Sequence, residues 1–184
     1  MLLSGKTMLD GLTIEDVERF VDENPGFRSP MMGYVAEHWL KKQLQETAGI
    51  TGVEKIPDRE ARKGDFLVTL EDGREVSVEC KCAFSSKWRK DKIHQDDICT
   101  VNLRSSDRQA PDTPGAMGGF SLDRGEFDVL AICVKSLTGN WDYWFIHNKW
   151  LEADPANSNK LSTKVNLTLG ITPFLFQDFL RSLA

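Results

Sequence analysis

Three charged residues flank a predicted β-hairpin at positions where they could do chemistry together. Asp65 opens the apolar run 66–70, and Glu79 and Lys81 lie near the end of the run 75–82, with an Asp-Gly turn signal between the two runs. Side chains alternate along a strand, so Glu79 and Lys81 should project from one face, opposite the apolar residues. The turn should bring Asp65 back beside them, so that one end of the hairpin presents two carboxylates and an ammonium group.

Such a group of charges predicts a cation site. Two neighbouring carboxylates repel each other unless a cation lies between them, and their oxygens suit Mg²⁺ or Mn²⁺. The ion could activate a water molecule and stabilise charge on a phosphoryl oxygen. Lys81 could orient the attacking water or stabilise the developing anion. The alternative interpretation is a solvated hairpin face on which Asp65, Glu79 and Lys81 form ordinary salt bridges.

This motif resembles that of the PD-(D/E)xK nuclease superfamily, with Gly64-Asp65, a hairpin and then Glu79-Cys80-Lys81. Gly64 stands where the family name has proline. Many members carry a glutamate on the preceding helix, and Gly33-Tyr34-Val35-Ala36-Glu37 is similar to that element, so the resemblance implies Glu37 as a third acidic ligand. The alternative for Glu37 is an exposed helix residue that pairs with Lys41.

The resemblance covers roughly residues 30–147, because the runs 127–132 and 144–146 are similar to later core strands of the family. It implies a restriction-endonuclease-like α/β fold, with a central mixed sheet flanked by helices. It also implies phosphodiester hydrolysis, most often of DNA, with Mg²⁺ or Mn²⁺ as the cofactor and Asp65, Glu79, Lys81 and Glu37 as the catalytic residues. Cutting both strands of a duplex with one site per chain calls for a homodimer or for two visits.

Periodicity predicts one mixed α/β domain over residues 1–184, in which 1–28 form a helical extension before a core of about 29–184. Thr13, with Asp16 three positions later, should cap a first helix that ends at Asn24-Pro25-Gly26. Ser29-Pro30 should begin a second helix that runs to about Thr47. A final helix should start at Thr172-Pro173. Strands are predicted at 53–56, 66–70, 75–82, 98–103, 127–134 and 141–146, and a long loop at 104–125.

Basic and aromatic side chains follow the hairpin directly, over residues 85–92, and suit phosphate contacts and base stacking. Arginines in or beside the long loop could clamp phosphates in the same way. The alternative in both places is a solvated loop. The predicted nucleic-acid contacts are Lys87, Trp88, Arg89, Lys90, Arg104, Arg108 and Arg124.

Other metal chemistries fit the sequence less well. Cys80 and Cys82 flank Lys81, but no further Cys or His has the spacing of a zinc site, so both cysteines are expected in the core. His38, His94 and His147 are isolated, and no HExxH motif occurs.

The composition permits the nuclease interpretation without requiring it. Of the 184 residues, 40% are hydrophobic and 28% charged, as in ordinary globular domains, but the net charge of −5 is unusual for a nucleic-acid binder. No signal peptide or membrane span is evident, so we expect a cytoplasmic protein. Two competing hypotheses stay open. One is a catalytically inactive nucleic-acid-binding or protein-interaction module on the same fold, and the other is an unrelated interaction domain.

Overall fold

The computed structural model of the chain describes residues 13–57, 64–83, 98–102, 104–105, 120–162 and 164–168. It opens with helix α1, Ile14–Glu23, whose N-cap is Thr13. The Asp16 N–H donates to Thr13 Oγ1 at 3.2 Å, and the Thr13 N–H donates to Asp16 Oδ2 at 3.1 Å. Each residue thus satisfies a backbone donor that the first turn leaves free. The predicted capping box and the end of this helix before Pro25 are both confirmed.

The second helix, α2, spans Pro25–Gln45, so the predicted start at Ser29-Pro30 was wrong. Pro25 occupies the first turn of α2, where a missing N–H costs nothing, and Pro30 lies inside the helix. Both prolines follow a residue type that favours helix starts, Asn24 and Ser29, so the same signal occurred twice within five residues. The earlier proline begins the helix.

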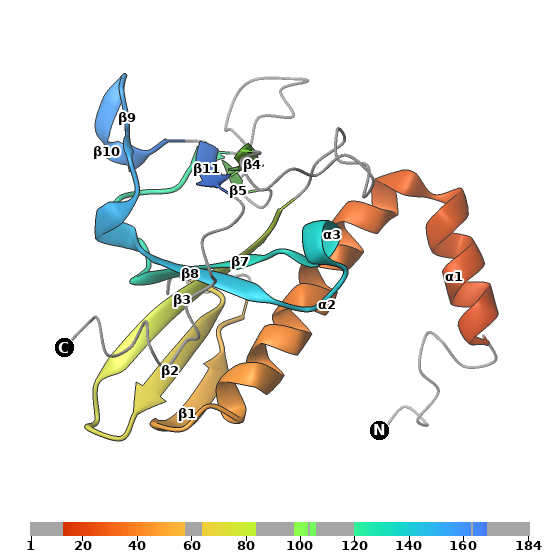
Figure 1. The fold of residues 1–184 in the computed structure, drawn as a ribbon, viewed down its shortest axis with the longest axis horizontal. Coiled ribbons are helices and arrows are strands. Elements are labelled where there is room, and N and C mark those ends of the chain that lie inside the picture. The colour runs from red at the N-terminus through yellow and green to blue at the C-terminus, as the bar shows by residue number, and fades with distance from the viewer. Residues whose placement is uncertain are drawn as a thin grey trace, which may run out of the picture.

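The centre of the fold is a five-stranded sheet in the order β1-β2-β3-β7-β8. Neighbours pair antiparallel except β3 and β7, which are parallel, so the sheet is mixed. Figure 1 shows α2 passing across one face of this sheet, with α1 beyond it, away from the strands. The predicted class, a mixed α/β fold around a central mixed sheet, is confirmed. The strands are β1 Ile50–Lys55, β2 Phe66–Leu70, β3 Glu75–Cys82, β7 Val129–Cys133 and β8 Tyr143–His147.

The β2–β3 hairpin has the predicted bounds. Its turn is closed by the Leu70 N–H, which donates to Arg74 O at 2.9 Å, and by the Gly73 N–H, which donates to Leu70 O at 3.0 Å. Gly73 has φ +82°, a conformation that glycine adopts without a steric penalty. The Asp72-Gly73 pair therefore fixes the register that sets Asp65 relative to Glu79.

Both faces of the sheet are buried. On one face, α2 contributes Ala36, Leu40 and Leu44 to a cluster that also contains Val78 and Cys80 of β3. On the other face, a second cluster contains Leu130 and Ile132 of β7 together with residues that come before and after the β7–β8 pair, among them Leu122, Phe127, Leu151 and Leu161. The central strands β3 and β7 consequently lie between two apolar layers, as expected for parallel neighbours in a mixed sheet.

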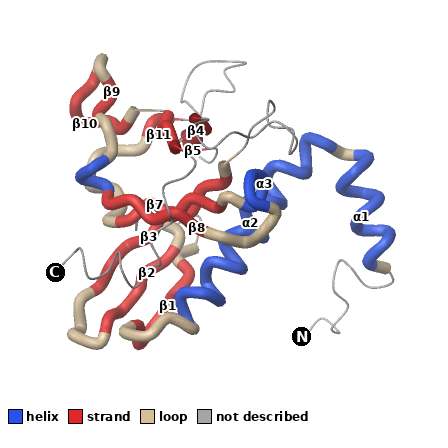
Figure 2. The backbone as a smooth tube through the Cα atoms, in the orientation of Figure 1, coloured by secondary structure: helices blue, strands red, loops and turns tan. Residues whose placement is uncertain are grey.

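Short strands form a separate group at the end of the central sheet toward which β3 runs, opposite the hairpin turn (Figure 2). They pair as β4 with β11, β5 with β6, and β9 with β10. The predicted loop 104–125 was wrong at its ends, because its first residues and residues 120–121 pair as β5 and β6. The bounds are β4 Ile98–Asn102, β5 Arg104–Ser105, β6 Phe120–Ser121, β9 Ala153–Asp154, β10 Asn157–Leu161 and β11 Lys164–Thr168.

Two short helical segments complete the described chain. Helix α3, Lys135–Thr138, connects β7 to β8, and a 3-10 turn, Asn148–Trp150, follows β8. The predicted final helix at 172–183 lies outside the described residues. Among the helices that the structure describes, none combines the length and apolarity needed to cross a bilayer.

Candidate functional site

The hairpin places Asp65 beside Glu79, as its register predicts. Phe66 pairs with Val78, so Asp65 lies at the next position outward, across from Glu79. The Asp65 N–H donates to Val78 O at 2.8 Å, and the Cys80 N–H donates to Asp65 Oδ2 at 2.7 Å. These two bonds hold the Asp65 carboxylate against the backbone between Glu79 and Cys80.

Glu79 and Lys81 project from the same face of β3, opposite Val78 and Cys80. Their partners across the parallel ladder are Leu130 and Ile132, which belong to the second apolar cluster. Glu79 is only 8% exposed, so the alternative of a solvated hairpin face is wrong for this residue. The sequence predicted the shared face correctly but not that a second apolar layer covers it.

Burial dominates the electrostatics of Glu79. It raises the pKa of the Glu79 carboxyl to about 7, the nearby carboxylates of Asp65 and Glu126 add to the rise, and the Lys81 ammonium opposes it. Burial also disfavours the charged form of Lys81, but the carboxylates of Glu79 and Asp65 outweigh it and raise the pKa of Lys81. Lys81 forms an ion pair with Glu79 Oε1. The site therefore holds a permanently charged ammonium beside a carboxyl that titrates near neutral pH.

Glu37 joins the group through a residue that the sequence analysis did not single out, Lys55. Lys55 Nζ lies 2.7 Å from Glu37 Oε2 and 3.5 Å from Asp65 Oδ1, so one ammonium group bridges α2 and the start of β2. The Glu37 side chain is 16% exposed, which rules out the alternative of an exposed helix residue. A signal was present: the alternation of β1 puts Lys55 on the same face as Val53, which packs against the core.

The glycine before Asp65 has a structural reason. Gly64 has φ +93°, and a Cβ atom there would lie 3.2 Å from Val78 O. Proline fixes φ near −65°, so it cannot occupy this backbone conformation, and any other side chain would meet the β3 backbone. The glycine at position 64 thus follows from how closely the chain approaches β3 just before the Asp65 carboxylate.

A second residue missed from the sequence is Glu126. It is buried, and its Oε2 accepts the Asp123 N–H at 2.7 Å, which closes a turn ahead of β7. Its carboxylate contributes to the raised pKa of Glu79, so it belongs to the electrostatic surroundings of the site. The turn-rich sequence around Gly125 gave no sign that Glu126 would be buried.

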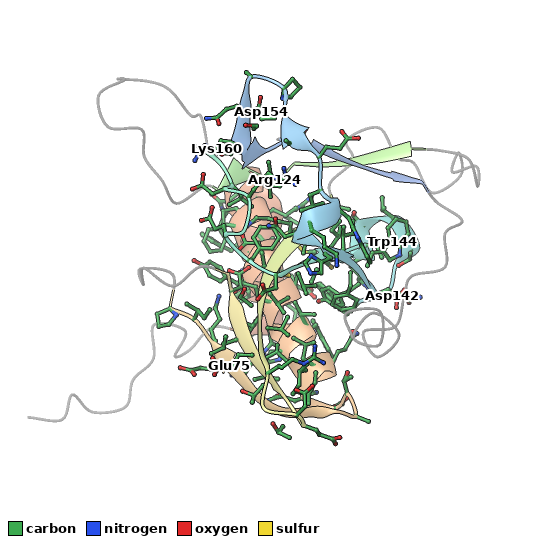
Figure 3. The ribbon with its side chains drawn as sticks, turned by 90° about the vertical axis from the view of Figure 1, so that its left-hand side faces the viewer. Glu75, Arg124, Asp142, Trp144, Asp154 and Lys160 are labelled. Atoms are coloured by element: carbon green, nitrogen blue, oxygen red, sulfur yellow. The ribbon has the colours of Figure 1, made fainter. Side chains whose placement is uncertain are left out.

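Of the predicted nucleic-acid contacts, only Arg124 has a described side chain. The Arg124 side chain is exposed, and the backbone N–H of Arg124 donates to the backbone carbonyl of Asn159 at 3.0 Å. Figure 3 shows Arg124 and Lys160 away from Glu75, in the other half of the molecule. Because β3 begins at Glu75, this strand runs toward that half. The backbone of Arg104 lies in β5. Lys87, Trp88, Arg89, Lys90 and Arg108 lie outside the described residues.

The described residues contain no set of three or more His, Cys, Asp and Glu side chains already arranged to hold a metal ion. Glu37 and Asp65 are bridged by Lys55, and Glu79 is paired with Lys81. The structure therefore brings Glu37 and Asp65 together through Lys55 on the α2 side of the sheet, while Glu79 pairs with Lys81 on the opposite face of β3. Two lysines supply the counter-charges. Cys80 and Cys82 are free thiols, and Cys80 is buried in the core as predicted.

No protein-family model and no curated protein matches the chain. Among solved structures, a bacterial homing endonuclease aligns with a TM-score of 0.44 and 14% sequence identity, over 78% of this chain and 80% of that one. The likeness is remote, so the chemistry of the site has to be inferred from its own residues.

Proposed function

We propose that the protein is a metal-dependent nuclease that hydrolyses phosphodiester bonds of DNA at the Asp65–Glu79 end of the β2–β3 hairpin. One observation carries the proposal. Glu79, a carboxyl with a raised pKa, is buried beside Asp65 and the Lys81 ammonium on the central strand of the sheet. Burying such groups costs stability, and strongly perturbed pairs of this kind cluster at functional sites.

Asp65 would hold Mg²⁺ or Mn²⁺ at the open end of the hairpin, with Glu37 reaching the ion from the α2 face of the sheet and Glu79 from the opposite face. Their oxygen donors suit these hard cations, and the ammonium of Lys55 between Glu37 and Asp65 indicates that this space favours positive charge. When bound, the ion supplies Lewis-acid chemistry and an acidified water. The Cys80 N–H and the Lys55 ammonium hold the two oxygens of the Asp65 carboxylate, so this donor is oriented before a cation arrives.

Lys81 would act on the substrate. Its ammonium stays charged at neutral pH and extends from the same face of β3 as Glu79. A fixed positive charge in a mostly buried place stabilises the charge that develops on a phosphoryl group more effectively than one in water. Lys81 would also orient the attacking water by hydrogen bonding.

We infer DNA as the substrate from the motif's resemblance and from basic residues of the sequence. Arg124 is exposed, and Arg104, Arg108 and the stretch from Lys87 to Lys90 are further proposed phosphate contacts. A homodimer would let two sites cut both strands. A cytoplasmic location fits the free thiols of the described cysteines.

A second function competes with this one: an inactive binding module on the same fold. It is favoured by the pairing of Lys55 with Glu37 and of Lys81 with Glu79, since ion pairs can stabilise a domain without any metal.

Incubation with supercoiled plasmid and with labelled oligonucleotides, in Mg²⁺, Mn²⁺ or chelator, separates the two functions. We expect metal-dependent cleavage by the wild type, and its loss in Glu79→Ala and in Lys81→Ala at unchanged far-ultraviolet circular dichroism. Glu75→Gln, an exposed change on the same strand, should cut like the wild type. A wild type that binds DNA without cutting it would favour the module. Normal cleavage by both alanine variants would contradict the assignment of the site.

A further inference from the structure

We propose that the Lys55 ammonium and a divalent cation are alternative occupants of the space between Glu37 and Asp65, so that Lys55 is a positioning residue that sets the metal affinity of the site. This inference rests on the proposed metal site. It assigns to Lys55 the role of a tethered cation that holds the carboxylates in place until an ion replaces it.

The geometry around Lys55 carries the inference. Its Nζ lies within ion-pair distance of both Glu37 Oε2, at 2.7 Å, and Asp65 Oδ1, at 3.5 Å. The Nζ atom is itself buried, although the whole side chain is 30% exposed, and it lies 5.3 Å from the centre of the Phe66 ring. Two carboxylates and an aromatic ring therefore lie close to the ammonium, and each of them stabilises a positive charge.

Lys55 and a divalent ion would repel each other if both stayed close to these carboxylates. Like charges within a few ångströms disfavour each other strongly where water is largely excluded. The long, flexible lysine side chain can withdraw toward solvent along its exposed part, because its stem keeps its apolar contacts while the head moves. Metal binding would then consist of an exchange of one cation for another, with Glu37 and Asp65 already preorganised.

The ion pair also explains how the site tolerates the absence of a metal. Glu37 is on α2, Lys55 ends β1, and Asp65 precedes β2, so the bridge ties three elements at the point where they meet. Without a counter-charge, Glu37 and Asp65 would repel each other across this junction. Lys55 therefore stabilises the metal-free protein and, for the same reason, weakens metal binding.

Direct titration with Mn²⁺, followed by the paramagnetic resonance signal of the free ion, tests the exchange in Lys55→Met. The variant should bind Mn²⁺ about tenfold more tightly than the wild type, because a competing unit charge has been removed. Its melting temperature in chelator should fall by about 2–4 °C, and added Mn²⁺ should raise it more than that of the wild type. Lys42→Met is the matched control, since Lys42 lies over the ring of Trp39 and the same charge is removed. It should bind Mn²⁺ like the wild type.

Equal, weaker or absent Mn²⁺ binding in Lys55→Met would overturn the inference. If that variant does not fold, a crystal structure of the wild type soaked in Mn²⁺ decides. Lys55 Nζ should leave ion-pair distance of Glu37 and Asp65, and an unmoved ammonium beside a bound ion would refute the exchange. The nuclease proposal fails separately: tighter Mn²⁺ binding by Lys55→Met with no DNA cleavage by the wild type would support the exchange and refute the nuclease.

Discussion

Replacing Glu79 with glutamine should reveal how much stability the protein loses when this buried carboxyl ionises. Burial and neighbouring carboxylates raise its pKa from the ordinary 4.5 to about 7. The folded protein therefore binds this proton more tightly than the unfolded chain does. The stabilisation by the protonated carboxyl is complete below about pH 4.5 and is lost as the pH rises through about 7. At about 1.4 kcal/mol per pH unit, the gap corresponds to about 3 kcal/mol.

The measurement is the free energy of unfolding in urea, with chelator present, at several values between about pH 4.5 and about pH 8. Glu79→Gln cannot ionise, so the difference between this variant and the wild type should move by about 3 kcal/mol in favour of the variant as the pH rises. The comparison cancels the titration of groups that both proteins share. Glu75→Gln, an exposed change on the same strand, should leave the wild-type profile almost unaltered. Parallel profiles for Glu79→Gln and the wild type would refute the claim that Glu79 is held in an apolar layer.

Three further outcomes are expected. Gly64→Ala should destabilise the fold by about 1–2 kcal/mol, and Gly64→Pro by more, because φ is +93° and the new Cβ would lie 3.2 Å from Val78 O. Thermal melts measure this loss of stability. An unchanged melting temperature for Gly64→Pro would contradict the backbone conformation described for Gly64. Cys80→Ser should cost roughly 1–3 kcal/mol through a poorly satisfied buried hydroxyl while Mn²⁺ affinity stays constant, whereas lost Mn²⁺ binding at normal stability would indicate a thiolate ligand. DNA affinity should fall steeply with salt, and the logarithmic slope should shrink by about one for each of Lys87→Ala and Arg89→Ala; an affinity indifferent to both changes would exclude this stretch from the interface.

The parts of the fold that were predictable from the sequence are those that local chemistry determines. The Thr13 capping box depends on two residues three positions apart, and the β2–β3 hairpin depends on alternation around one Asp-Gly turn. The capping box is present, and the hairpin has the predicted strands on either side of its turn. The juxtaposition of Asp65 and Glu79 followed directly from the register of the hairpin, since no distant residue is needed to bring them together.

The parts that were not predictable depend on residues far along the chain. The second apolar layer over Glu79 comes from segments after residue 120, so alternation in β3 could not distinguish a solvent face from a buried one. The partnership of Lys55 with Glu37 joins a strand to a helix whose packing is set by the whole core. The pair β9–β10 includes a polar stretch, Asn157–Leu161, that lacks the apolar alternation of a strand.

The parallel pairing of β3 with β7 has a consequence for the order in which the protein folds. The Asp65–Cys80 bond closes a loop of 15 residues, whereas Ser77 and Asp128, which bond side chain to backbone in both directions, are 51 residues apart. Short loops close at a smaller entropic cost, so the hairpin can form before the long-range pairing does. In kinetic terms, destabilising changes in the hairpin should mainly slow refolding, and Asp128→Ala should mainly speed unfolding. The hairpin would thus bring the carboxylates of Asp65 and Glu79 together early, and they would become buried only when β7 pairs with β3.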